Sequence, residues 1–119
     1  ALAEAGVAVQ GADGRPHTDS HHLALPAAAH GGGQRASKHL ALANIMVCGI
    51  GLPLAPVAGD LNGIRIGTQE VTRLGMKEEA MEEIARLLAR VLVDGEAADR
   101  VRADVAVFRK QYQALTFVR

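Results

Sequence analysis

Arg65 is the residue whose type and setting point most directly to chemistry. It is the middle residue of Gly-Ile-Arg-Ile-Gly at 63–67, a period-two pattern that predicts a strand with Ile64 and Ile66 on one face and Arg65 on the other. Flanking glycines would let a ligand or another backbone approach closely. A guanidinium binds a carboxylate through two parallel hydrogen bonds. The residues alone leave two interpretations open: an exposed arginine paired with a neighbouring acid, which is the commoner case, and a carboxylate-binding site.

The histidines could suggest a metal site, but their spacing matches no common set of ligands. The adjacent pair His21 and His22 would face opposite ways on a strand and could not bind one ion. The single cysteine, Cys48, does not complete a ligand set. We therefore predict no metal site. The five histidines, expected on loops and the surface, are His17, His21, His22, His30 and His39.

Other reactive side chains lack a catalytic context. Cys48 closes an apolar run and is expected to be a buried structural residue. Residues 49–51, Gly-Ile-Gly, lack the third glycine and the following helix of a dinucleotide site. The acidic residues between 78 and 83 are typical of a solvated helix face, on which Glu82 and Arg86 would form an i,i+4 pair.

The composition indicates one compact domain without general affinity for polyanions. The chain has 119 residues, 49% of them hydrophobic, which is enough for a single core. Its formal net charge is zero, so we expect no nucleic-acid partner and no membrane partner. No apolar run approaches the ~20 residues of a membrane span. One cysteine excludes an internal disulfide and favours a reducing compartment, and we predict a cytoplasmic protein.

The elements that would position Arg65 are short strands, one long loop and helices. Residues 34–43 have the composition of a helix. Residues 49–59 hold two prolines and are expected to be a loop, with a turn at 62–63. Residues 1–6 would be the end of a connecting helix, with a small carboxy-terminal domain at 7–119. Strands are predicted at residues 7–10, 22–25, 45–48 and 63–67.

Two amphipathic helices are predicted in the last third of the chain. The first begins near Lys77 and ends at Gly95, and the second covers about 97–114. Apolar residues of the second helix fall at intervals of 4, 3, 4 and 3, and they are Val101, Val105, Phe108, Tyr112 and Leu115. Helices covering one small sheet predict an α+β domain of two layers.

Four segments, in order, resemble the carboxy-terminal domain of serine hydroxymethyltransferases. Residues 2–5 resemble the end of the family's connecting helix, and Thr-Asp-Ser-His at 18–21 resembles its Thr-Asp-Asn-His. Residues 33–36 resemble the start of its next helix. The longest match, at 63–76, resembles the family's Gly-Ile-Arg-Ile-Gly-Thr-Pro-Ala-Val-Thr-x-Arg-Gly. The resemblance covers the chain to about residue 93, and the last helix agrees in type.

This resemblance implies the small domain of a fold-type I pyridoxal-phosphate enzyme, a homodimer when complete, that makes or breaks an amino-acid Cα–Cβ bond. It implies that Arg65 binds the substrate carboxylate, with Ser20 and His21 as further candidate substrate-binding residues.

The resemblance also implies that the cofactor lysine lies in a large domain before this region. Lys38, Lys77 and Lys110 fall in predicted helices outside any such motif. We therefore expect no catalytic and no cofactor-binding residue in this chain, and no activity without a large domain or partner chain that carries that lysine.

Departures from the family's motifs bear on the reaction. Cys-Gly-Ile at 48–50 stands where the family has Asn-Lys-Asn, whose second Asn lies near the folate, and Gln69-Glu70 stands where it has Pro-Ala. An alkyl group cannot replace an amide that donates and accepts. Tetrahydrofolate use is therefore in doubt, and the chain resembles the threonine and fluorothreonine transaldolase branch. The alternatives are a folate-dependent serine/glycine hydroxymethyltransferase and a non-catalytic assembly domain of the same fold.

Overall fold

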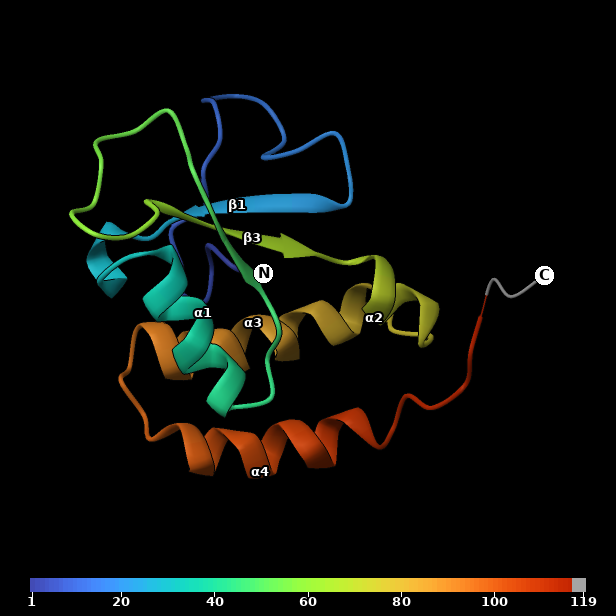
Figure 1. Ribbon diagram of the computed structural model, residues 1–119. Helices are drawn as coiled ribbons and strands as arrows, with labels where there is room; N and C mark the ends of the chain where they lie inside the picture. Colours follow the sequence, from blue (N-terminus) through green and yellow to red (C-terminus); the bar gives the residue numbers. More distant parts are fainter. Residues whose placement is uncertain (117–119) are drawn as a thin grey trace.

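The computed structural model describes residues 1–116, which form one antiparallel sheet with helices on one of its faces (Figure 1). Its strands are β1 (His22–Pro26), β2 (Cys48–Ile50) and β3 (Gly63–Gly67), in the order β1-β3-β2. The helices are the 3₁₀ turn η1 (Ala28–His30), α1 (Gly33–Leu42), α2 (Gln69–Arg73), α3 (Glu78–Leu92) and α4 (Ala98–Arg109). The expected α+β class is confirmed.

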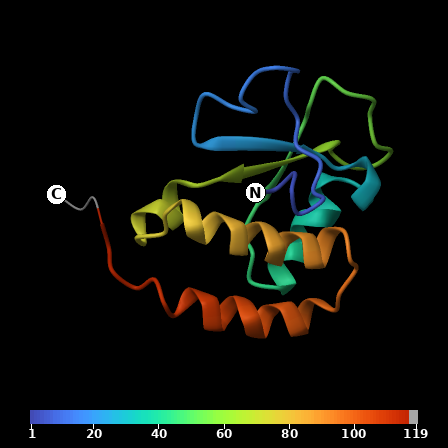
Figure 2. The ribbon, with the colours of Figure 1, turned by 180° about the vertical axis from the view of Figure 1, so that it is seen from behind.

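The apolar residues of the strands and helices meet in one core. Ile64 of β3 and Leu25 of β1 are fully buried, on the sheet face that the helices cover. α1 packs directly on β2 and β3, while α3 and α4 pack on α1 and on each other. α1 and α3 form the layer next to the sheet, and α4 lies farther from the sheet (Figures 1 and 2). Burial of these aliphatic side chains is the main force that holds the layers together.

Backbone contacts fix the start of α1 against the sheet. A Cβ atom at Gly33 would collide with the carbonyl oxygen of Gly63, and it would lie 3.2 Å from the Cα of Gly49. The carboxylate of Asp60 accepts hydrogen bonds from the N–H groups of Gln34 (2.8 Å) and Arg35 (3.0 Å). These donors belong to the first turn of α1, which has no side-chain cap of its own. A residue of the segment between β2 and β3 therefore caps the helix.

Several sequence predictions are confirmed by the structure. The predicted strands at 22–25 and 63–67 and the predicted helix at 34–43 match β1, β3 and α1 to within one residue. The first amphipathic helix, expected between Lys77 and Gly95, is α3.

Other predictions were wrong. Residues 7–10 are not a strand, although Val7 is buried, because their ladder with β1 is reduced to one bond from Gln10 N to Ala24 O at 2.8 Å. β2 begins at Cys48, where the predicted strand ended. α4 ends at Arg109 instead of 114, so its apolar stripe stops at Phe108, and Leu115 is 61% exposed.

Residues 30–33, where η1 passes into α1, are held in place by backbone hydrogen bonds. Gly32 N donates to Ala27 O at 3.0 Å, and Gly33 N donates to Leu61 O at 2.7 Å. The expected turn at 62–63 is also wrong, because Gly63 already belongs to β3. Residues 1–6 form one helical turn, in which Ala5 N donates to Ala1 O at 3.0 Å.

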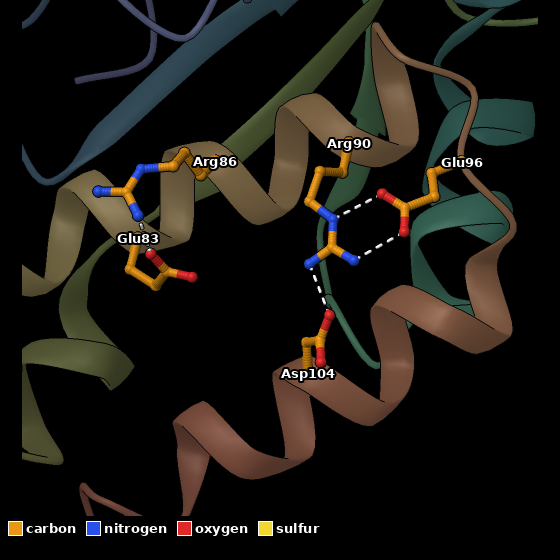
Figure 3. Close-up of polar contacts among 5 residues, drawn as sticks. All are labelled: Glu83, Arg86, Arg90, Glu96 and Asp104. Carbon is orange, nitrogen blue, oxygen red and sulfur yellow. Dashed lines mark hydrogen bonds and ion pairs between the residues drawn. The ribbon is translucent and has the colours of Figure 1, made fainter.

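An arginine joins the last two helices (Figure 3). Arg90 of α3 binds both carboxylate oxygens of Glu96, at 2.6 and 2.7 Å, and Asp104 of α4 at 2.7 Å. The hydrogen bonds from Arg90 lower the pKa of the Glu96 carboxyl. On the neighbouring turn Arg86 pairs with Glu83 and not with the expected Glu82. The Arg90 cluster fixes the turn between α3 and α4.

Candidate functional site

The sheet face opposite the helices carries Arg65 at its centre. β3 is the middle strand, and Arg65 pairs in register with Ala24 of β1 and Cys48 of β2. Side chains alternate along a strand, so residues in register share a face. We call this face the open face. Its members are His22, Ala24, Pro26, Cys48, Ile50, Gly63, Arg65 and Gly67.

Two loops stand beside the open face. Figures 1 and 2 show that residues 7–21 and residues 51–62 both rise from the sheet on the side away from the helices. Asn62 organises the second loop, because its buried side-chain amide bonds the backbone of Leu52, Leu54 and Ala55. On the sheet between these loops, Arg65 is flanked by the short side chains of Ala24 and Cys48.

Arg65 is exposed and has no acidic partner in residues 1–116. Ile64 and Ile66 on either side of it are 0% and 9% exposed, as their alternation predicts. None of the ion pairs in the described part of the chain involves Arg65. Its neighbours across the strands, Ala24 and Cys48, are short and uncharged. The interpretation of Arg65 as half of a surface ion pair therefore finds no support in these residues.

His22 lies on the open face near Arg65. It pairs in register with Gly67, two residues along β3 from Arg65. Partial burial lowers the pKa of His22, and the positive charges of His21 and Arg65 lower that pKa further. The lowered pKa favours the neutral imidazole. Sequence reasoning missed His22 because only the pairing of β1 with β3 reveals its position.

Ser20 and His21 precede β1 and order its beginning. The hydroxyl of Ser20 lies 3.2 Å from Thr18 Oγ1 and accepts a hydrogen bond from His22 N at 3.1 Å. The backbone oxygen of His21 accepts from Thr68 N at 3.0 Å. The rings of His21 and His22 lie 4.2 Å apart between centroids, so the expectation that they face opposite ways was wrong. His21 lies before the strand, where the alternation does not apply.

The space above the two glycines of β3 holds side chains of this chain. A Cβ atom at Gly63 would lie 2.6 Å from Leu52 Cδ1. A Cβ atom at Gly67 would collide with Gln69 Oε1 and would lie 3.0 Å from Gln69 Nε2. Both Cβ positions belong to the open face. The glycines therefore admit Leu52 and Gln69 close to the sheet, and Gln69 is a polar residue that sequence reasoning did not place there.

Cys48 is half-buried on the open face, so its assignment to the buried core was wrong. Within residues 1–116 no three His, Cys, Asp or Glu side chains are grouped as a metal site requires. No helix in this part of the chain is long and apolar enough to cross a bilayer.

The lysines do not fit a covalent cofactor site on this face. Lys38 lies on α1, Lys77 directly precedes α3 and Lys110 directly follows α4, and all three are exposed. None belongs to the open face. A pyridoxal-phosphate site built at the open face would need a lysine from outside these strands.

The structure is that of a small α+β domain with one face of its sheet left uncovered by its own helices. No family model matches the chain. It is 44% identical to an alpha-methylserine aldolase from Ralstonia over 119 residues, which are 100% of this chain and 27% of that protein. It is 42% identical to a serine hydroxymethyltransferase from Aeropyrum pernix, over 98% of this chain and 27% of that protein. The chain therefore spans about a quarter of the length of these relatives.

A comparison with solved structures leads to the same group of enzymes. The L-threonine transaldolase of Pseudomonas fluorescens superimposes with a TM-score of 0.77 and 26% identity, over 94% of this chain and 25% of that chain. These matches identify the chain as a homologue of the carboxy-terminal portion of the serine hydroxymethyltransferase family. Its homologues are pyridoxal-phosphate enzymes.

Proposed function

We propose that this chain is the substrate-carboxylate domain of a pyridoxal-phosphate enzyme that makes or breaks the Cα–Cβ bond of an amino acid. The observation that carries the proposal is Arg65, an exposed cation without an acidic partner in residues 1–116, at the centre of the open face. The homology with enzymes of this family supports it independently.

The chain's own contribution is binding and orientation. The guanidinium of Arg65 holds the two carboxylate oxygens of the amino acid and thereby fixes the rotation about its Cα–N bond, which decides which bond at Cα is aligned for cleavage. Fixed orientation of a reacting bond is a large source of rate enhancement. The cofactor supplies the electron sink that this chemistry needs. Because the lysines of this chain do not fit its attachment, we assign the cofactor to a large domain or partner chain, in a complete enzyme that is a homodimer.

An aldol-type reaction with an aldehyde, as in a threonine transaldolase, is the form of the reaction that we favour. Ile50 belongs to the open face opposite Gly63, at a position where hydroxymethyltransferases have an amide-bearing residue. Its alkyl side chain offers no hydrogen bond to a folate. The similarity to proteins named as alpha-methylserine aldolases also supports an aldol-type reaction.

The test is an assay of the complete enzyme with and without tetrahydrofolate. We expect cleavage of a β-hydroxy amino acid to aldehyde, together with exchange of threonine with an acceptor aldehyde, at rates that folate changes less than twofold. A strict folate requirement with serine would assign the chain to the folate-dependent hydroxymethyltransferases. Absence of every such activity, in a complete protein that binds the cofactor, would support a non-catalytic assembly domain.

A further inference from the structure

We propose that Gln69 is a second carboxylate-binding residue of this site, placed beside Arg65, with His22 closing the same corner of the open face. This inference rests on the proposed function and extends it to a residue for which the sequence offered no role.

The position of Gln69 follows from its contact with Gly67. The amide group of Gln69 occupies the space that a side chain at position 67 would fill. Position 67 faces the same way as position 65, because two residues along a strand restore the direction of the side chain. The amide of Gln69 therefore lies on the open face, next to Arg65 along β3.

The chain reversal after β3 holds Gln69 there. Thr68 N and Thr68 Oγ1 both donate to the backbone oxygen of His21, at 3.0 and 3.3 Å, which ties the end of β3 to the start of β1. Gln69 is the next residue and the first of α2. Its backbone is thus fixed from both sides, and its side chain folds back over the sheet.

His22 bounds the site on the β1 side. It lies opposite Gly67 in register, so His22 and Gln69 both lie next to this glycine. Arg65 is two residues before Gly67 on the same strand. The lowered pKa of His22 favours its neutral form, which adds no repulsion to the cation beside it.

The chemistry of the three side chains fits a carboxylate. A carboxylate offers about four lone-pair positions, and a bidentate arginine uses two of them. The amide of Gln69 brings N–H donors without a charge, and it makes no hydrogen bond to another side chain within residues 1–116. Gln69 is exposed and therefore accessible to a ligand.

The experiment compares Gln69→Glu and Gln69→Ala with the parent in the complete enzyme, using glycine as the probe. A glutamate would place a second anion beside the carboxylate and neutralise Arg65, so we expect the dissociation constant of glycine to rise at least ~10-fold, and for Gln69→Ala ~3-fold or more. Ethylamine, which lacks the carboxylate, should bind all three proteins equally. Gln111→Glu, an exposed glutamine beyond the end of α4, is the matched control and should bind glycine as the parent does.

Glycine binding by Gln69→Glu within twofold of the parent would overturn the inference, as would an equal loss in Gln111→Glu. Circular dichroism of each variant separates a binding effect from unfolding, and Gln69→Ala gives the answer if the glutamate variant is unstable. Arg65→Ala distinguishes the two proposals. If it weakens glycine binding while the Gln69 variants do not, the proposed function stands and this inference fails. If Arg65→Ala also binds normally, the proposed function fails with it.

Discussion

Asn62 holds the peptide backbone of Leu52 from both sides. Its Oδ1 accepts a hydrogen bond from Leu52 N at 2.7 Å, and its Nδ2 donates to Leu52 O at 3.0 Å. The same amide reaches Leu54 O at 3.0 Å and Ala55 O at 3.2 Å. Asn62, the residue directly before β3, therefore sets the path of the loop that borders the open face, through contacts with residues up to ten positions earlier in the chain.

Replacing Asn62 by Ala should loosen this loop and destabilise the domain. The variant leaves partly buried backbone groups without partners, and each such loss costs about 1–3 kcal/mol. We expect a fall of about that size in the free energy of unfolding, measured by urea denaturation. Gln113→Ala removes only an exposed bond to Lys110 O and should change stability little. Equal stability of Asn62→Ala and the parent would contradict the role given to the amide.

Changing Arg65 to Lys or Ala in the complete enzyme should impair substrate binding without unfolding the domain. Lysine keeps the charge but loses the planar fork, and alanine loses both. A charge-assisted hydrogen bond is worth ~1.5–3 kcal/mol, so loss of the bidentate contact should lower kcat/KM at least ~10²-fold. Arg102→Ala, an exposed arginine of α4, serves as control. Substrate affinity of Arg65→Ala within about threefold of the parent, or loss of its circular dichroism signal, would make Arg65 a structural residue.

This chain alone should form no covalent adduct with pyridoxal phosphate at a defined site. Its exposed lysines lie away from the open face, and we assign the attachment lysine to the rest of the enzyme. Borohydride reduction of a mixture of chain and cofactor, followed by peptide mass mapping, measures any adduct. A single stoichiometric adduct at Lys38, Lys77 or Lys110 is the result that would refute the assignment.

Acid should weaken the start of α1 through Asp60. Hydrogen bonds from the backbone N–H groups of Gln34, Arg35 and Leu61 lower the pKa of this carboxyl in the folded protein. A lowered folded pKa gives stability that is complete above the unfolded pKa, near ~4, and is lost as the pH falls through the folded value. Asp60→Asn should therefore lower the melting temperature at pH 7 by a few degrees. Between about pH 4 and pH 2 the melting temperature of the parent should fall more than that of the variant, because only the parent has this carboxylate to protonate. Parallel pH profiles for the two proteins would disagree with this linkage.

Local patterns in the sequence predict the strands and helices of this fold better than they predict which distant residues these elements contact. The alternation in 63–67 fixes β3 and the outward direction of Arg65, because side-chain direction depends only on position in the strand. The register that brings His22 opposite Gly67 depends on pairing across more than forty residues, which no local pattern encodes. The same is true of Asp60, whose capping of α1 follows from tertiary structure.

The errors have local causes as well. α2 has five residues and is too short for a helical period to appear in the sequence. The segment 7–10 has the residues of a strand, but a single bond to β1 replaces a ladder. Gln69 was noted only as a departure from a motif, because its position over Gly67 requires the reversal after β3.

The contact of Gly33 with the carbonyl of Gly63 has a mechanical consequence. At this contact the backbones of α1 and β3 touch directly, so no side chain lies between them that could change rotamer and let one element shift against the other. α1 cannot slide along β3 unless the two first separate. We therefore expect α1 and β3 to move together, and a hinge that would bring Arg65 toward a substrate to lie outside this contact.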